Sequence, residues 1–239
     1  MERLDKLIAL QANMTRSEAQ RLIRAGKVTV DGAACRNPAA KLDPQSQRVA
    51  LGGRPIAYKE HLYLMLNKPA GLLCVSRDPR APTVVDLVPE PLRRRGLFPA
   101  GRLDRDTHGL VLLTDDGEFT HRILSPKSGV YKRYQAIVDG PVDNAAIEAF
   151  RRGTSLEDGT RCLPADLRIL TDGDNPLAEI RICEGRFHQI KRMFASVGRK
   201  VLWLKRFSIG GLELDPALQE GECRELTGWE KDSVLPKGV

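Results

Sequence analysis

The chain has 239 residues, of which 41% are hydrophobic and 29% charged, and its formal net charge is +7. This length and composition are those of a globular protein with one large domain, or one domain and a small module, and they exclude a chain too short to bury a core. No apolar run approaches the roughly 20 residues of a membrane helix and the first residues contain no signal-peptide core, so we expect a cytoplasmic protein with no membrane partner.

The cysteines and the charge narrow the class of protein further. The five cysteines are Cys35, Cys74, Cys162, Cys183 and Cys223, an odd number with no two close together. This excludes a zinc-binding spacing and a redox pair, so we expect reduced thiols. The positive net charge favours an anionic partner such as nucleic acid.

The first 60 residues predict two helices followed by short strands. Leu4, Leu7 and Ile8 share one face of the first helix. Thr15 and Glu18 have the spacing of a capping box at the start of the second helix. A strand in Lys-Val-Thr-Val, residues 27–30, then reaches a tight Asp-Gly turn. The segment is therefore predicted to be a small α+β module.

This module carries most of the net charge, with 11 Lys and Arg against 6 Asp and Glu. A solvated basic face would explain such a surface without any ligand, and RNA phosphates are the alternative partner. Its layout resembles the S4 RNA-binding module in residues 3–6, 15–19 and 26–32. The resemblance implies RNA contacts through Arg3, Lys6, Arg16, Arg21, Arg24 and Lys27.

A boundary is expected where the module ends. Residues 37–59 are rich in Pro, Gly, Gln and Lys and are interpreted as a last short strand that runs into a linker. This places an RNA-binding module at residues 1–60 and a larger catalytic domain at residues 61–232. Residues 233–239, which include Pro and Gly, are expected to form a frayed tail.

The larger domain contains predicted strands and turns before one long helix. Strands are expected at residues 62–66, at residues 110–113 and within residues 129–140, with turns at Asn67–Gly71 and Asp115–Gly117. A helix is expected at residues 187–197, and its inward stripe consists of Ile190, Met193, Phe194 and Val197.

Two carboxylates, Asp104 and Asp106, lie beside Arg102 just before the apolar strand. A core strand needs neither charge, whereas a reaction site uses both. Two acids suggest a glycosidase mechanism with an acid and a nucleophile. We disfavour that mechanism because the segment before Gly109 is predicted to be a loop, which does not hold both acids on one face.

Three segments together resemble the pseudouridine synthases that act on ribosomal RNA. They are Gly101–Leu110 with its Gly-Arg-Leu-Asp start, Lys132-x-Tyr134, and Glu184–Met193 with its His-Gln-Ile-Lys-Arg-Met ending. With the S4-like module, the resemblance covers nearly the whole chain. It implies an α+β fold, in which the S4-like module precedes a domain with a mostly antiparallel, mixed sheet flanked by helices. It also implies isomerisation of a uridine without a cofactor.

The resemblance also assigns roles to single residues. Asp104, the aspartate of the Gly-Arg-Leu-Asp motif, corresponds to the essential nucleophile or base, and a carboxylate suits a glycosidic bond whose C1′ gains positive character. Lys191 corresponds to its ionic partner, and Tyr134 to an active-site tyrosine that stacks on the flipped base. The expected substrate-binding residues are Arg102, Ile190, Arg192, Lys132 and Lys68.

The target RNA is predicted from finer details of the motifs. The His-Gln-Ile-Lys-Arg-Met form and the Thr-Asp-Asp-Gly after the strand most resemble the branch that modifies small-subunit 16S rRNA, at a site of the uridine-516 type. Large-subunit enzymes are close relatives, so 23S rRNA is the alternative target. The implied partner is rRNA or an assembling ribosomal subunit, and the enzyme is expected to be a monomer.

Two other classes of function are alternatives for this sequence. A non-catalytic RNA-binding or ribosome-assembly protein would keep the fold, but it has no reason to retain a carboxylate such as Asp104 beside RNA phosphates. A nucleoside hydrolase would release free uracil. The sequence contains no cluster of metal ligands and no phosphate-binding glycine loop, so neither a metal nor a cofactor is expected.

Overall fold

The computed structural model describes residues 1–236 and divides into two compact units. The first unit contains residues 1–62 together with residues 89–97, and the second contains residues 63–88 and the chain from residue 98 onward. The segment 89–97 packs with the first unit, although the residues on either side of it in the sequence belong to the second. Arg94 fixes it there, because its guanidinium donates to the backbone carbonyl oxygens of Lys59 and Glu60 at 2.9 and 2.7 Å.

The first unit consists of two helices and short antiparallel strands around one small core. Thr15 and Glu18 form the predicted capping box at the start of α2, and positive φ at Asp31 and Gly32 makes the predicted tight turn. Leu4, Ile8 and Ile23 are fully buried in the core. The elements are β1 (Glu2–Arg3), α1 (Leu4–Gln11), α2 (Arg16–Arg24), β2 (Val28–Val30), β3 (Ala33–Ala34), β4 (Lys41–Leu42), β5 (Val49–Leu51) and β6 (Arg54–Pro55).

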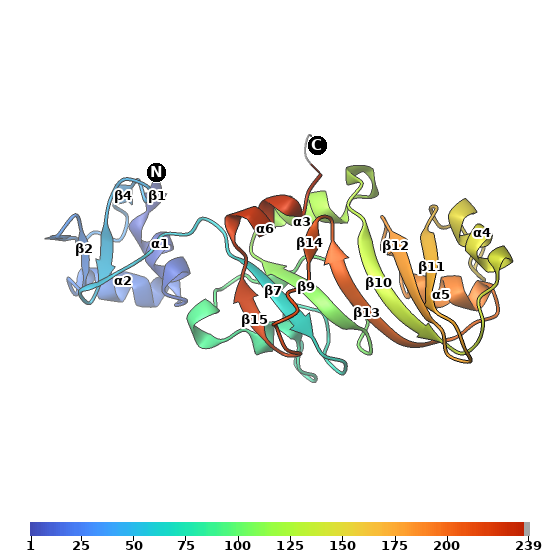
Figure 1. Cartoon of the computed structure of the whole chain (residues 1–239). Coiled ribbons are helices and arrows are strands. Elements are labelled where there is room, and N and C mark those ends of the chain that lie inside the picture. Colours follow the sequence, from blue (N-terminus) through green and yellow to red (C-terminus); the bar gives the residue numbers. More distant parts are fainter. Residues whose placement is uncertain (237–239) are drawn as a thin grey trace. The chain divides into compact units, whose positions relative to one another are not determined.

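The second unit is built on a nine-stranded sheet whose main order is β11-β12-β10-β13-β9-β7-β15 (Figure 1). Neighbouring strands are antiparallel except for β13 and β9, which are parallel over two residue pairs. The predicted mostly antiparallel, mixed sheet is therefore confirmed. The strands are β7 (Tyr63–Lys68), β8 (Phe98–Pro99), β9 (His108–Thr114), β10 (Lys132–Val138), β11 (Asp166–Thr171), β12 (Leu177–Ile182), β13 (Val201–Ile209), β14 (Leu212–Glu213) and β15 (Cys223–Glu225).

The helices of the second unit differ from the sequence prediction in two places. Asp116, predicted to lie in a turn, instead begins a helix, because its carboxylate caps α3 by accepting from the Phe119 amide at 2.9 Å. The helix predicted at residues 187–197 starts later, since His188 adopts a left-handed conformation with φ of 49°. The helices are α3 (Gly117–Leu124), α4 (Asn144–Arg152), α5 (Gln189–Ser196) and α6 (Gly228–Ser233), with 3₁₀ turns at Val84–Leu87, Glu90–Leu92 and Pro126–Ser128.

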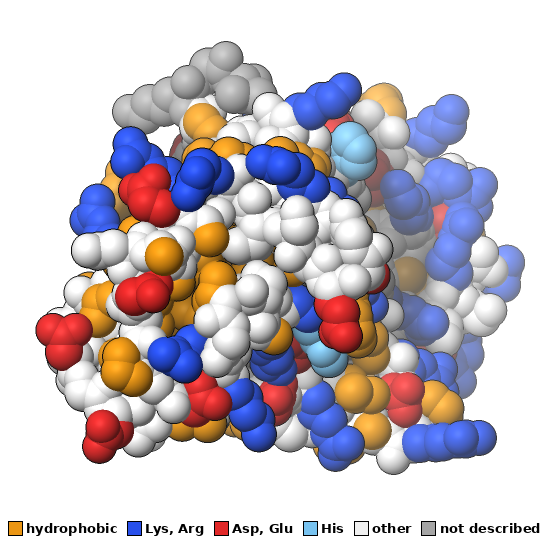
Figure 2. Space-filling view, turned by 90° about the vertical axis from the view of Figure 1, so that its right-hand side faces the viewer, with side chains coloured by type: hydrophobic (Ala, Val, Ile, Leu, Met, Phe, Trp, Pro, Cys, Tyr) orange, Lys and Arg blue, Asp and Glu red, His pale blue; other side chains and the backbone are white. Residues whose placement is uncertain are grey.

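Helices α4 and α5 pack together at the β11 end of the sheet. Phe150 of α4 and Phe194 of α5 are both fully buried, and their ring centroids lie 5.0 Å apart. This contact fixes the body of α5, whose first turn reaches the site described below. On the outer face at this end, Lys and Arg side chains lie among Asp and Glu side chains and exposed hydrophobic ones (Figure 2).

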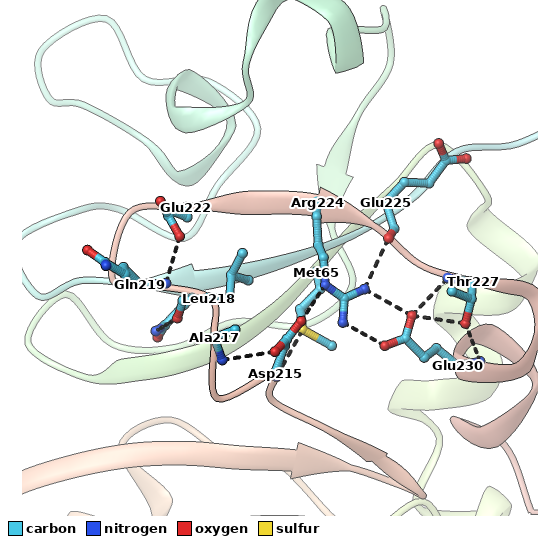
Figure 3. A network of polar contacts seen from close by, with 11 residues as sticks. Met65, Asp215, Ala217, Leu218, Gln219, Glu222, Arg224, Glu225, Thr227 and Glu230 are labelled. Atoms are coloured by element: carbon cyan, nitrogen blue, oxygen red, sulfur yellow. Dashed lines mark hydrogen bonds and ion pairs between the residues drawn. The ribbon is translucent and has the colours of Figure 1, made fainter.

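The other end of the sheet is held by an arginine network (Figure 3). Arg224 of β15 donates to Asp215 and to Glu230, each at 2.7 Å, and so ties α6 to the sheet edge. The hydrogen bond from Arg224 lowers the pKa of Glu230 to about 2. Val234 is fully buried in the adjoining core, whereas residues 237–239 of the predicted tail lie outside the described residues.

Candidate active site

The loop between β8 and β9 carries Asp104, and buried Lys68 holds this loop by its backbone. The Lys68 ammonium lies 2.9–3.2 Å from the carbonyl oxygens of Pro69, Asp104, Arg105 and Thr107. Lys68 is 0% exposed, and burial lowers its pKa. The lysine therefore fixes the main chain on either side of the Asp104 side chain.

Gly109 brings this loop against strand β13. A Cβ atom at Gly109 would lie 2.2 Å from the backbone oxygen of Arg206, so only glycine allows the parallel contact between β9 and β13. The glycine has φ of 100°, which other residues rarely adopt. The Gly-x-x-Asp motif and its downstream glycine thus place Asp104 close to a strand almost 100 residues later in the chain.

The opposite wall of the site is the segment between β12 and α5. The buried carboxylate of Glu184 accepts hydrogen bonds from the Leu163 amide, the Gln189 side chain and the Arg186 guanidinium at 2.8–3.0 Å. These bonds hold the turn before α5. His188 then takes the left-handed conformation at the helix start, a conformation that non-glycine residues adopt only when their surroundings fix it.

The two walls meet at Asp104. The Lys191 ammonium of α5 lies 3.2 Å from Asp104 Oδ2 and 2.5 Å from Asp106 Oδ1, and His188 Nε2 lies 3.5 Å from Asp104 Oδ1. Burial acts to lower the pKa of Lys191, but the contacts with Asp106 and Asp104 outweigh it and raise the pKa. Lys191 therefore stays charged beside the carboxylate.

Asp104 and Asp106 differ in their surroundings. The Asp104 side chain is 26% exposed and lines a cavity, whereas Asp106 is 72% exposed and lies outside it. The hydrogen bond from Lys191 lowers the pKa of Asp106. The loop therefore brings only one of its two acids to the cavity, which does not match a glycosidase that pairs Asp104 with Asp106.

The cavity has a volume of about 610 Å³, within the usual range for small-ligand sites. Its floor is formed by side chains of β10 and β13. Tyr134 of β10 is paired in register with Arg206 of β13, and the arginine Nη1 lies 3.4 Å from the tyrosine hydroxyl. Lys132, two residues before Tyr134, and Ile190 and Leu204 also line it. The cavity thus combines the carboxylate of Asp104, that of Glu184, which its own donors occupy, flat aromatic and apolar walls, and several cations.

Comparison with known proteins identifies the family. The model of the RNA pseudouridylate synthase family matches residues 62–196, more than half of the chain, and the S4 domain matches residues 2–55. The chain belongs to the RNA pseudouridine synthases. It is an isomerase with an N-terminal S4 domain, as the motifs predicted.

Individual relatives of this pseudouridine synthase match over nearly its whole length. It is 46% identical over 237 residues to ribosomal small subunit pseudouridine synthase A of Escherichia coli, covering 98% of this chain and all of the relative. It is 43% identical over 226 residues to the RNA pseudouridine synthase YtzG of Bacillus subtilis, covering 94% and 95% of the two chains. A solved pseudouridylate synthase with 38% identity matches with a TM-score of 0.68, over 98% of this chain and all of that one.

Six of the eight residues expected at the site of this synthase line the cavity: Asp104, Tyr134, Lys191, Arg102, Ile190 and Lys132. Arg102 is exposed at its rim. The other two lie elsewhere. Lys68 is enclosed by backbone carbonyls, and Arg192 points away from the cavity to pair with Asp158 at 2.5 Å.

Two residues at this site, His188 and Arg206, have no role assigned to them by the motifs. His188 is part of the quoted motif, but its left-handed backbone and its approach to Asp104 depend on the turn that Glu184 holds. Arg206 could have been found from the strand pattern of the sequence. It occupies an inward position of β13 between Leu204 and Ser208, and a charged residue on the buried face of a strand is a candidate for a functional role.

The predicted RNA-binding residues of the S4 domain fall into two groups. Arg3 and Arg16 both donate to buried Asp5, at 2.9 and 3.1 Å, while their outer parts remain exposed. Lys6 pairs with Glu2 at 3.2 Å. The second group, Arg21, Arg24 and Lys27, is exposed.

Two further properties of residues 1–236 are relevant here. None of the helices has both the length and the apolar character that a membrane span requires. No cluster of three or more His, Cys, Asp or Glu side chains in this part of the chain is arranged to hold a metal ion.

Proposed function

We propose that this synthase isomerises one uridine of small-subunit 16S rRNA to pseudouridine, with Asp104 acting at the sugar. The observation that carries the proposal is the contact of Asp104 with charged Lys191 at the edge of a cavity of nucleotide-binding size. The relatives named for the small ribosomal subunit support the choice of RNA. We therefore also propose a cytoplasmic location, where an rRNA substrate is available during ribosome assembly.

The S4 domain is proposed to hold the RNA while the second unit performs the reaction. Residues 1–60 supply the exposed cations of α1 and α2, which suit RNA phosphates. Residues 61–232 supply the cavity. A stacked uridine cannot turn over in place, so it must leave its helix, at a cost of a few kcal/mol. Arg102, exposed at the rim, is placed to bind the displaced strand.

The reaction exchanges one bond to the sugar for another. The bond from N1 of uracil to C1′ breaks, and its electron pair stays with the base. C1′ gains positive character, which the Asp104 carboxylate offsets, either by bonding to it or by taking a sugar proton. After the base turns, C5 bonds to C1′; in the first route the bond from Asp104 to C1′ breaks, and in the second Asp104 returns the proton to the sugar. The base then loses the C5 proton and N1 gains one, so no other reactant is consumed.

The neighbours of Asp104 suit this step. Lys191 places a positive charge beside the carboxylate without enclosing it, because its ammonium contacts Asp104 from the α5 side only. Tyr134 and Ile190 present flat or apolar surfaces on which a uracil ring can lie. A fixed pair of surfaces would keep the base near the sugar while it turns.

The test is to map pseudouridine in 16S and 23S rRNA of cells with and without this gene. We expect loss of one 16S site, restored by the wild-type gene but not by Asp104→Asn. Loss of a 23S site would keep the chemistry and overturn the choice of RNA. Restoration by Asp104→Asn would overturn the role of the carboxylate.

A further inference from the structure

Arg206 is a buried cation of the cavity that the motif residues do not explain. It is 4% exposed and lines the cavity. Its Nε donates to the Leu110 carbonyl oxygen at 2.8 Å, and its Nη1 approaches the Tyr134 hydroxyl at 3.4 Å. Its Nη2 has no hydrogen-bond partner. A guanidinium with an unused donor inside a binding cavity suggests that the substrate supplies the missing acceptor.

The charge of Arg206 is also uncompensated. Within residues 1–236 no carboxylate forms an ion pair with it, although buried arginines are normally paired. Asp104, the acid of the proposed reaction, already faces Lys191 and His188. A buried charge of this kind is unfavourable unless a bound anion balances it.

Lys132 adds a second cation on the same side of the cavity. It is buried and donates to the carbonyl oxygens of Ile123 and Cys183, at 3.1 and 3.4 Å, so it too has no carboxylate partner among the described residues. Burial, with the nearby charge of Arg206, lowers its pKa to about 8. The cavity therefore has the carboxylates of Asp104 and Glu184 in its walls, each with donors of its own, and two cations at its floor that have no carboxylate partner among the described residues.

We infer that Arg206 stabilises the negative charge that the uracil ring acquires when its bond to C1′ breaks. This rests on the proposed function. The electron pair of the broken bond spreads over the ring to its carbonyl oxygens, which become stronger hydrogen-bond acceptors. Nη2 of Arg206 donates to one of these oxygens, and the charge is returned when C5 bonds to C1′ and N1 regains a proton.

Tyr134 takes part through its hydroxyl group. Because this oxygen accepts from Arg206 Nη1, its own proton is left to point elsewhere, and the base is the acceptor that the cavity would provide. The guanidinium also lies 5.9 Å from the Tyr134 ring, so charge and aromatic surface face the ligand together. Asp104 would then offset the positive sugar while Arg206 offsets the negative base.

The experiment varies the leaving base and the arginine together. Single-turnover cleavage of the uridine glycosidic bond is measured with an RNA that the wild type modifies, and with the same RNA carrying 5-fluorouridine at the target. Fluorine withdraws electrons and so stabilises the negative charge of the departing ring, which then depends less on stabilisation by the protein. Arg206→Gln is expected to lower the rate about 10²-fold for uridine, and much less for 5-fluorouridine, with RNA affinity retained.

Equal losses on the two RNAs would overturn the inference, because a misplaced Tyr134 would slow both alike. Weaker RNA binding with an unchanged rate would also overturn it and assign Arg206 to a phosphate. If Arg206→Gln does not fold, Arg206→Lys gives the same contrast, since an ammonium keeps the charge but loses the planar fork.

Two controls separate this inference from other failures. Arg181→Gln removes an exposed arginine of β12 that lies outside the cavity, and it should leave both rates unchanged. The RNA is chosen by wild-type activity rather than by assumption. A wild type that modifies 23S rRNA would overturn the proposed target while the test of Arg206 proceeds, and a wild type that modifies no RNA would overturn the proposed function and this inference with it.

Discussion

Asp5 in the S4 domain and Asp104 at the cavity are each approached by side-chain nitrogen atoms of more than one residue. Asp5 is 0% exposed, and Arg3, Arg16 and Gln20 occupy its oxygens with hydrogen bonds of 2.9–3.2 Å. Asp104 has one ammonium at 3.2 Å and an imidazole at 3.5 Å, and it faces open space.

Pairing with a cation alone therefore does not mark a reactive acid. Both aspartates lie beside cationic side chains. Asp5 has no lone pair left for a ligand and joins α1 to α2, which is a structural task. Asp104 keeps part of its surface available. The two aspartates therefore differ in whether their carboxylate oxygens are open to a ligand, not in whether they are paired with cations.

The largest expected effect is the loss of turnover in Asp104→Asn. The amide is isosteric but cannot bond to C1′ or take a proton, so the single-turnover rate should fall by at least about 10⁴-fold. Thermal unfolding and RNA affinity should remain those of the wild type. A variant that keeps more than a small fraction of the wild-type rate would contradict a catalytic role for Asp104. Asp104 would then resemble Asp5 in having only a structural task.

Lys68→Met should produce the next effect. Removing the ammonium leaves four backbone carbonyl oxygens under the Asp104 loop without their donor, so the loop can shift. A displacement of about 1 Å costs about 10²-fold in rate. We expect this loss in kcat with unchanged RNA affinity. A parallel loss of RNA affinity would show instead that Lys68 acts on the substrate.

Asp5→Asn should change stability rather than chemistry. The hydrogen bond from Arg3 holds the pKa of Asp5 well below its usual range. A lowered pKa means that the ionised form stabilises the fold above a pH of about 4, and that this stabilisation is lost as the pH falls further. In acid titrations followed by circular dichroism, the wild type should lose stability below that pH. Asp5→Asn should show a weaker dependence and be less stable at pH 7 by about 1–3 kcal/mol.

The smallest effect is expected for Arg24→Gln on α2, an exposed cation of the S4 domain. If this arginine contacts one phosphate, RNA binding should weaken modestly for all sequences, and the salt dependence of binding should fall by about one ion. The matched control is Arg54→Gln, an exposed arginine on β6 outside the two helices. Equal salt slopes for Arg24→Gln and the wild type would contradict the predicted contact.

Much of the fold could be predicted because its signals are local. The capping box at Thr15 and the turn at Asp31 depend on neighbours within four residues, and both occur as expected. Asp116 shows where a local signal has two meanings. The same Asp-Gly pair ends a strand in a turn or caps a helix, and the apolar positions of α3, Phe119 and Ile123, decided for the helix.

The site was predictable where the motifs name its residues and not where distant strands meet. Asp104, Tyr134 and Lys191 line one cavity, as the resemblance implied. Arg206 reaches it only because β13 lies beside both β10 and β9, a pairing across many residues that no single stretch encodes. The enclosure of Lys68 likewise depends on carbonyl groups almost 40 residues away.

The clamp by Lys68 has an evolutionary consequence. The Lys68 ammonium contacts only main-chain carbonyl groups, so its hold on the loop does not depend on which side chains the loop carries. The residue at position 106, whose carboxylate is mostly in solvent, is therefore not needed to shape the loop. Related enzymes can therefore carry another residue at position 106 to suit a different RNA, while the loop still holds Asp104 in the same place.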